Sequence, residues 1–187
     1  MSDWVWVVIV VAALALLAVA VWALAARRRR DRLQGRFGPE YDRAVDEHGS
    51  RREAEAELAR REEKRARLDI VPLEPEARER YSRSWQELQN RFVDEPSGTL
   101  DEADRLVTDV MRERGYPMDE FDQRVADISV DHPDVVEHYR AARAIHGARE
   151  NGDASTEDLR QAVVHYRALF AELLGSDETD EEEVPKQ

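Results

Sequence analysis

The chain has five histidines, the residue type most often used for metal binding and acid–base catalysis, and their spacing indicates whether they can act together. They are His48, His132, His138, His146 and His165. No two of them are four residues apart, and none belongs to a His-Glu-x-x-His arrangement, which places two imidazoles on one zinc ion. His138 and His165 fall on helix flanks beside apolar stripes, so we interpret them as side chains at the edge of a core. We therefore predict no metal site.

The other residue types that perform chemistry lack the context that a reaction needs. Asp119, Glu120 and Asp122 cluster where a helix is expected to begin, a position that the helix dipole already favours for acidic side chains. Ser97 and Ser129 have no nucleophile-elbow pattern around them, and the sequence contains no glycine-rich phosphate loop. We predict no catalytic residue and no cofactor, and an enzyme is the weakest of three functional hypotheses.

The charge and cysteine content restrict the class of partner. The chain has 41 acidic and 28 basic residues, a formal net charge of −13, so the body repels nucleic acid. Beyond the N-terminal region, basic residues form no stripe with interleaved aromatic residues. The chain has no cysteine, which excludes disulfides and thiolate sites and is consistent with a reducing compartment.

The strongest signal in the sequence is an apolar segment from Trp4 to Ala26 that contains no charge, proline or glycine. A helix rises about 1.5 Å per residue, so this segment spans roughly 34 Å and exceeds a hydrocarbon core of about 30 Å. Trp4, Trp6 and Trp22 lie near its two ends, where indole rings favour the lipid headgroup region. We predict a transmembrane anchor with a basic flank over residues 1–30.

A cleaved signal peptide is the alternative interpretation of the same segment. Signal peptides have a basic N-terminal region and a shorter apolar stretch before a small-residue cleavage site. Residues 1–3 contain no basic side chain, and the positive charge follows the apolar segment instead of preceding it. Residues 23–25 match a small-x-small site, but alanine is frequent throughout the segment. We favour an uncleaved anchor.

Four consecutive arginines, Arg27, Arg28, Arg29 and Arg30, directly follow the apolar segment. Basic residues beside a membrane helix stay on the cytoplasmic side, whereas a very short N-terminus is easily translocated. We predict a single-pass protein of the plasma (inner) membrane whose N-terminus is outside and whose body is cytoplasmic. The arginines also suit binding to anionic lipid, each contributing about 1 kcal/mol near the surface, although orientation alone explains them.

Residues 31–74 are expected to form a charged juxtamembrane helix, over residues 40–68, and then a proline-containing linker. Gly49 and Ser50 mark a point where this helix kinks or splits. Its few apolar residues leave two roles open: it is a stalk or partner-binding helix, or it is a solvated helix that lies on the body.

Residues 75–174 are expected to form a small helical bundle, so the predicted fold class is all-α. Four strongly amphipathic helices are expected, with a shorter one between them. In the first, Tyr81, Trp85 and Phe92 share an apolar face, which predicts core packing and, as the alternative, a binding surface. Residues 175–187 are strongly acidic and are expected to be a disordered tail.

The helix starts in the bundle are predicted from capping residues. Thr99 and Glu102 match a capping box. Pro117 is expected to open the shorter helix, and Asp131 is expected to cap the helix that follows. The last helix is expected to begin at a cap formed by residue 155 or 156.

Three stretches, RFVDEPSGTLDEADRLVTDVMRERGYP, FDQRVADISVDHPDVVEHYRAARAI and TEDLRQAVVHYRALFAELL, resemble a widespread family of uncharacterised bacterial proteins. The resemblance covers residues 37–174 and implies a bacterial, actinobacterial source. Many members of that family carry one N-terminal membrane helix, and some are described only as secreted. The resemblance brings no activity, cofactor or catalytic residue, and we prefer the arginine argument to a secreted location.

These observations lead to one main hypothesis and two weaker ones. We expect a membrane-anchored cytoplasmic helical module that recruits or scaffolds a membrane-associated protein partner. The alternative is a sensor or regulator whose bundle binds a small ligand, and an enzyme comes third. An exposed apolar patch on the bundle would favour the first hypothesis, and an apolar cavity inside it would favour the second.

Overall fold

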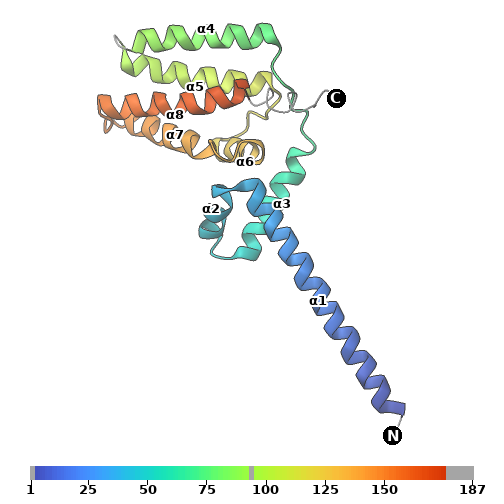
Figure 1. The fold of residues 1–187 in the computed structure, drawn as a ribbon. Helices are drawn as coiled ribbons and strands as arrows, with labels where there is room; N and C mark the ends of the chain where they lie inside the picture. Colours follow the sequence, from blue (N-terminus) through green and yellow to red (C-terminus); the bar gives the residue numbers. More distant parts are fainter. Residues whose placement is uncertain (1–2, 93–94, 176–187) are drawn as a thin grey trace, which may run out of the picture. The chain divides into compact units, whose positions relative to one another are not determined.

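The computed structural model describes residues 3–92 and 95–175, and over these residues the chain forms eight helices and no strand (Figure 1). The all-α prediction is confirmed. The expected disordered tail lies almost entirely in residues 176–187, outside the described residues. The chain divides into two compact units, Met1–Ala59 and Arg60–Gln187. The helices are α1 (Asp3–Phe37), α2 (Pro39–His48), α3 (Arg51–Arg65), α4 (Pro75–Phe92), α5 (Pro96–Glu113), α6 (Phe121–Asp131), α7 (Val136–Glu150) and α8 (Thr156–Gly175).

In the first unit, α1 is one continuous helix that carries the apolar segment and the arginines. Its 35 residues span about 52 Å. No side chain of its most apolar stretch is buried within the protein, and the helix is long and apolar enough to cross a membrane. The helix extends about three turns beyond Ala26, so the arginines lie on a rigid helical surface and not on a loop.

The end of α1 packs against α2 and the beginning of α3 in a small apolar cluster. Gly38 and Gly49 adopt positive φ angles of 46° and 64°, which glycine reaches without a Cβ clash, and the chain reverses at each. The helix expected over residues 40–68 splits at Gly49, one of the two outcomes predicted for that position, because the left-handed Gly49 ends α2. The cluster consists of the fully or almost fully buried side chains Leu33, Phe37, Tyr41, Ala44, Ala54 and Leu58.

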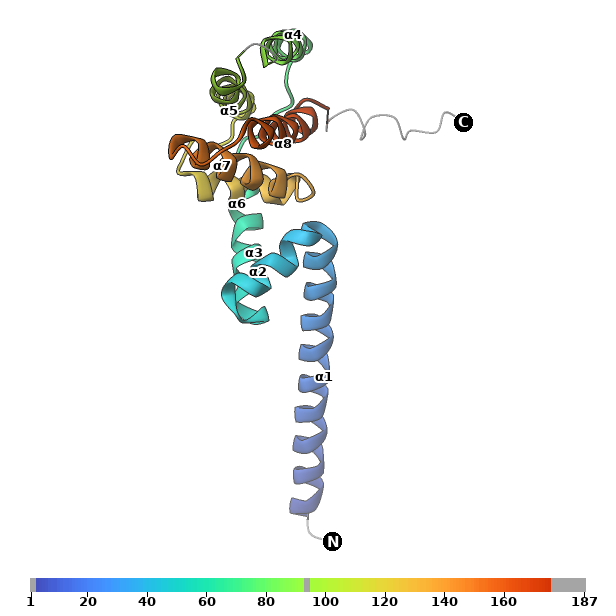
Figure 2. The same cartoon turned by 90° about the vertical axis from the view of Figure 1, so that its left-hand side faces the viewer.

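The second unit is a bundle in which neighbouring helices pack in the order α4, α5, α8 and α7, with α6 against α7 (Figure 1, Figure 2). Its core is formed by apolar side chains that the helical periodicity places on the inner faces. Those with no solvent exposure are Leu88, Leu100, Ala103, Val107, Val110, Met111, Ile128, Val136, Tyr139, Ala142, Ala162, Tyr166, Leu169 and Leu173.

Trp85 is a core residue, as its position on the apolar face of α4 predicts. Its side chain is 5% exposed and stacks on Phe170 of α8, with ring centroids 4.6 Å apart and an interplanar angle of 20°. Tyr81 and Phe92 are half-buried at the edges of the same core. The alternative interpretation of this stripe as a binding surface is therefore wrong for Trp85.

Two of the predicted helix starts are wrong by several residues. The capping box at Thr99 and Glu102 does not form, because α5 already begins at Pro96 and Thr99 donates its hydroxyl to the Glu95 carbonyl 2.7 Å away. Pro117 does not open a helix either, since α6 begins at Phe121. α5 thus begins before its predicted start, and α6 begins after its predicted start.

Asp131 does not cap α7, because it is the last residue of α6. Its carboxylate accepts hydrogen bonds from Arg65 and from the Tyr116 hydroxyl, the latter at 3.1 Å. The cap predicted at residue 155 or 156 is confirmed as Ser155, which exchanges hydrogen bonds with Asp158: the Asp158 amide donates to the Ser155 hydroxyl at 3.2 Å, and the Ser155 amide donates to the Asp158 carboxylate at 2.8 Å.

The second unit includes the last turn of α3, which ion pairs attach to α6. Lys64 donates to Asp127 at 2.9 Å, and the Asp127 side chain is only 2% exposed. Gln123 donates to the other oxygen of the same carboxylate at 3.1 Å. This buried carboxylate is therefore satisfied on both oxygens, as a charge removed from water requires.

Gly115 allows the linker to pass against the end of α5. The amide of Val71 donates to the Arg114 carbonyl at 2.9 Å. Gly115 has a φ of 94°, and a Cβ built on it would lie 2.4 Å from the Asp69 carbonyl oxygen. Both the backbone angle and the contact require glycine at this position.

Candidate functional site at the end of the apolar helix

An open cavity of about 670 Å³ lies between α1 and the first turn of α3, within the first unit. One wall is a face of α1 on which Trp22, Ala26, Arg30 and Gln34 follow one another at intervals of four residues. Residues four apart lie above one another on a helix, so this wall runs about 18 Å along the helix axis. It leads from the apolar segment into the charged segment.

The opposite wall comes from the beginning of α3. Arg51 and Arg52 occupy the first two positions of that helix, and Glu55 lies one turn further along. Arg27 and Asp31 of α1 complete the charged lining. The wall thus holds four arginines against two carboxylates, and the N-terminus of α3 adds its own partial positive charge.

The interior of the site is held by hydrogen bonds between its helices. The Tyr41 hydroxyl donates to the Glu55 carboxylate at 2.9 Å, and Arg29 donates to the Glu55 backbone carbonyl at 3.2 Å. Burial and then the neighbouring Glu55 raise the pKa of Tyr41, whereas the guanidinium groups of Arg30 and Arg51 oppose that rise. These two arginines, one from α1 and one from α3, therefore both lie close enough to the Tyr41 hydroxyl to affect its pKa.

Arg30 has a donor that the described residues leave unused. Its Nε atom is buried and has no hydrogen-bond partner among them. Most buried polar groups are hydrogen-bonded, so this Nε atom is an exception among the polar atoms of the site.

The structure separates the predicted interface residues into groups. Trp22, Arg27 and Arg30 line the cavity. Arg28 and Arg29 are exposed but are not among the cavity residues. The remaining two, Trp4 and Trp6, are 73% and 62% exposed at the opposite end of α1.

Arg51 and Arg52 are site residues that the sequence analysis did not identify. They lie more than 20 positions after the arginine cluster, in a segment assigned to one charged helix. The signal was the Gly49-Ser50 break: a chain reversal at that point brings the next residues back toward the helix before it. Only this reversal brings Arg51 and Arg52 close to Arg27 and Arg30 of α1.

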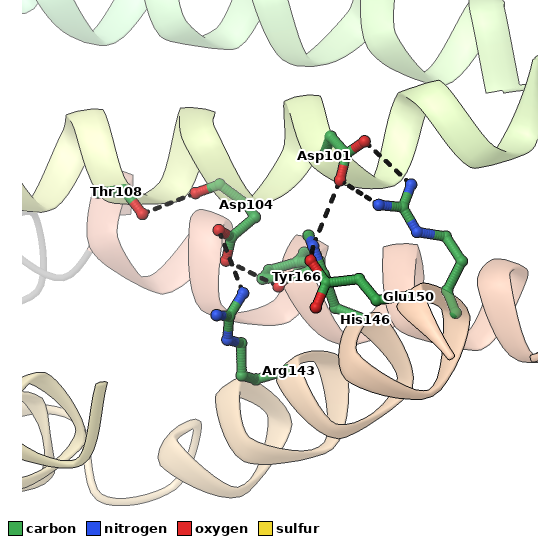
Figure 3. A network of polar contacts seen from close by, with 8 residues as sticks. Asp101, Asp104, Thr108, Arg143, His146, Glu150 and Tyr166 are labelled. Atoms are coloured by element: carbon green, nitrogen blue, oxygen red, sulfur yellow. Dashed lines mark hydrogen bonds and ion pairs between the residues drawn. The ribbon is translucent and has the colours of Figure 1, made fainter. Parts of the chain in front are cut away.

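A second polar cluster joins three helices of the bundle (Figure 3). Asp101 of α5 accepts two hydrogen bonds from Arg149 of α7, at 3.0 and 2.5 Å. His146 lies beside it, with Nε2 3.3 Å from the Asp101 carboxylate. The hydrogen bond from Arg149 lowers the pKa of Asp101, so this carboxylate stays ionised and holds α7 against α5.

The other half of this cluster is centred on Asp104. Its carboxylate accepts the Tyr166 hydroxyl of α8 at 2.8 Å and lies 3.9 Å from the Arg143 guanidinium (Figure 3). Thr108 donates its hydroxyl to the Asp104 backbone carbonyl at 2.8 Å. Both hydroxyls therefore donate to Asp104. These contacts hold α5, α7 and α8 together.

His138 and His165 form a pair that their spacing of 27 residues did not predict. Their Nδ1 atoms are 2.9 Å apart, so one ring donates to the other. Burial and then the neighbouring His138 lower the pKa of His165. Over the described residues, no group of three His, Cys, Asp or Glu side chains is placed to hold a metal ion.

Comparison with known protein families, with curated proteins and with solved structures finds no match to this chain. The resemblance to an uncharacterised bacterial family stays a prediction.

Proposed function

We propose that this protein is a single-pass membrane protein whose α1 anchors the bundle on the cytoplasmic face of the plasma membrane, where the bundle recruits or scaffolds a protein partner. The observation that carries the proposal is an apolar helix with no side chain buried in its most apolar stretch. A soluble protein would have to cover that surface, and a bilayer covers it completely.

The length and ends of α1 support the anchoring role. Trp4 and Trp22 are 18 residues apart, which corresponds to about 27 Å along a helix and is close to the thickness of a hydrocarbon core. Both side chains are more than 70% exposed. The four arginines after Ala26 favour the orientation with the N-terminus outside.

The surface of the bundle determines the kind of partner it fits. Outside α1, the only large hydrophobic side chains exposed among the described residues are Val71 and Val164, at 44% and 47%. The described part of the bundle therefore offers no large apolar patch, so the surface feature expected to favour a scaffold is not found there. An interaction with the bundle then depends on charged and polar contacts. Such contacts give selectivity and fast association more than high affinity. Confinement to the membrane compensates by raising the effective concentration of a neighbouring partner.

The competing sensor hypothesis gains no specific support. The cavity described above lies in the first unit and not in the bundle. Binding of a small ligand inside the bundle stays a prediction.

Membrane fractionation tests the anchoring role. We expect the full-length protein to remain in the membrane pellet after washing with high salt and with alkaline carbonate, and to retain its original N-terminus. Deleting residues 4–26 should move it to the soluble fraction, whereas deleting residues 176–187 should not. Extraction by salt alone, or a mature N-terminus near Ala26, would overturn the proposal.

Partner recruitment is tested by crosslinking in native membranes. Replacing residues 4–26 with an unrelated apolar helix of the same orientation should preserve the crosslinked partner. Reversing exposed charges on the bundle should reduce its yield. Loss of the partner on the helix exchange alone would show that the membrane helix is the recognition element, and that division of roles would be wrong.

A further inference from the structure

We propose that the cavity between α1 and α3 binds the phosphate group of an anionic membrane phospholipid. This inference rests on the proposed function, because it requires α1 to lie in a bilayer. It goes further by naming a ligand class and a site that includes Arg51 and Arg52, which a topology signal does not require.

The charge of the cavity suits a phosphodiester. Its wall holds Arg27, Arg30, Arg51 and Arg52, and planar guanidinium groups bind phosphate oxygens through paired hydrogen bonds. Arg30 is half-buried, so part of its side chain faces the open space that it lines. Four arginines converging from two helices leave an excess of positive charge over the two carboxylates of the wall.

The shape of the cavity favours a lipid over a free anion. Trp22 and Ala26 belong to the apolar segment, and Arg30 lies one turn beyond Ala26 on the same face of α1. The cavity therefore offers an apolar surface at one end and guanidinium groups at the other. A phospholipid has the same division, with acyl chains that remain in the bilayer and a phosphate at its edge.

The site also explains why α2 and α3 fold back on α1. Leu33, Phe37, Tyr41 and Leu58 are buried where these helices meet. This packing fixes the beginning of α3 beside the arginines of α1. Orientation in a membrane needs only basic residues close to the span, so a packed second wall with two further arginines indicates a binding role.

Native mass spectrometry of the full-length protein in dodecyl maltoside micelles tests the site. The probes are phosphatidylglycerol, phosphatidylcholine of the same chain length, and glycerol 1-phosphate, which carries the phosphate without acyl chains. We expect one phosphatidylglycerol molecule to bind saturably to each protein, and we expect phosphatidylcholine not to displace it. The double variant Arg51→Gln, Arg52→Gln should weaken its binding by about 10-fold or more, since charge-assisted hydrogen bonds are lost.

The matched control removes the same charge from the same region. Arg28→Gln with Arg32→Gln removes two exposed arginines that follow the apolar segment but are not part of the cavity wall. If the cavity is the binding site, this double substitution should weaken the binding of phosphatidylglycerol by less than about 3-fold, as expected for screened surface charges. An equal or larger loss in the control would show general attraction to the anionic surface and would overturn the site.

The remaining outcomes separate the lipid site from the anchor. Displacement of phosphatidylglycerol by an equal concentration of glycerol 1-phosphate would show that the ligand is a soluble phosphate, and the lipid assignment would fall. Carbonate-resistant insertion of Arg51→Gln, Arg52→Gln together with wild-type lipid binding would overturn the site and leave the anchoring function intact. Failure of the wild-type protein to insert would overturn both. Unchanged circular dichroism in all variants shows that the loss is not unfolding.

Discussion

Replacing Trp85 in the core of the bundle gives a prediction whose size follows from the structure. The side chain is 95% buried, since its exposed fraction is 5%, and a buried aromatic residue removes about 150–250 Å² from water. At about 25 cal/mol per Å², this area corresponds to about 4–6 kcal/mol. Alanine keeps part of the buried surface, so truncation should lose about 3–5 kcal/mol of unfolding free energy, the usual range for this substitution. Trp85→Ala should therefore remove a large share of the bundle's stability.

The conservative variant Trp85→Phe is the matched control. The indole Nε1 is buried and has no hydrogen-bond partner among the described residues, so phenylalanine loses no hydrogen bond. It also keeps an aromatic ring against Phe170, whose centroid is 4.6 Å from that of Trp85. We expect a cost of only about 1–2 kcal/mol.

Urea unfolding of a fragment that starts at Arg60 measures both variants. This fragment keeps the turn of α3 that pairs with α6, and circular dichroism at 222 nm follows its helices. Trp85 is its only tryptophan, so fluorescence gives an independent measure in the unsubstituted fragment. A cost below about 1 kcal/mol for Trp85→Ala would refute the burial argument, and equal costs for the two variants would refute the role of the ring pair.

The remaining predictions use the same unfolding assay. Gly115→Ala should lower the free energy of unfolding by at least about 1 kcal/mol, because the φ of Gly115 is 94° and a Cβ would clash with a backbone carbonyl. Gly147→Ala, in open space on α7, should raise the free energy of unfolding by about 0.5–1 kcal/mol. Equal effects of the two substitutions would contradict this reasoning. Lys64→Ala should cost about 1–3 kcal/mol, since it leaves a buried carboxylate of α6 with one fewer donor, and a neutral result would show that the pair is dispensable. Burial lowers the pKa of both His132 and His165 in the folded protein. As the pH falls, the unfolded chain therefore takes up protons before the folded protein does. The free energy of unfolding should be highest above about pH 6.5 and should decrease as the pH drops below it. Replacing both histidines with glutamine should flatten this slope, and an unchanged slope would place its origin elsewhere.

Helical periodicity predicted the body of the fold because each helix buries its own apolar stripe. The apolar face expected for the first bundle helix, with Tyr81, Trp85 and Phe92, lies within α4, Pro75–Phe92. The helix starts at Thr99 and Asp131 could not be predicted in the same way. Thr99 has a capping pattern but lies inside α5, and Asp131 has an acid's preference for a cap but pairs with Arg65 from α3. At Thr99 the helix begins earlier in the chain, at Pro96. At Asp131 local propensity competes with a contact between segments far apart in the sequence.

The candidate site was also predicted only in part, because only some of its residues have a signal in the local sequence. The apolar segment and Arg27–Arg30 are continuous in the sequence, so their composition identifies them. Arg51 and Arg52 join the site only because Gly49 turns the chain back, and a run of charged residues gives no sign of such packing. The contacts between Asp101 and Arg149 also cross between helices and have no local signal.

Cysteine accessibility on intact cells tests the central claim, that α1 holds the bundle on the cytoplasmic side, most directly. The chain has no cysteine, so single replacements at Ser2 and at Asp153, which is exposed in the turn before α8, report on the two sides without background. We expect a membrane-impermeant maleimide to label Ser2→Cys on intact cells and to label Asp153→Cys only after permeabilisation. Labelling of Asp153→Cys on intact cells, with Ser2→Cys protected, would contradict the account.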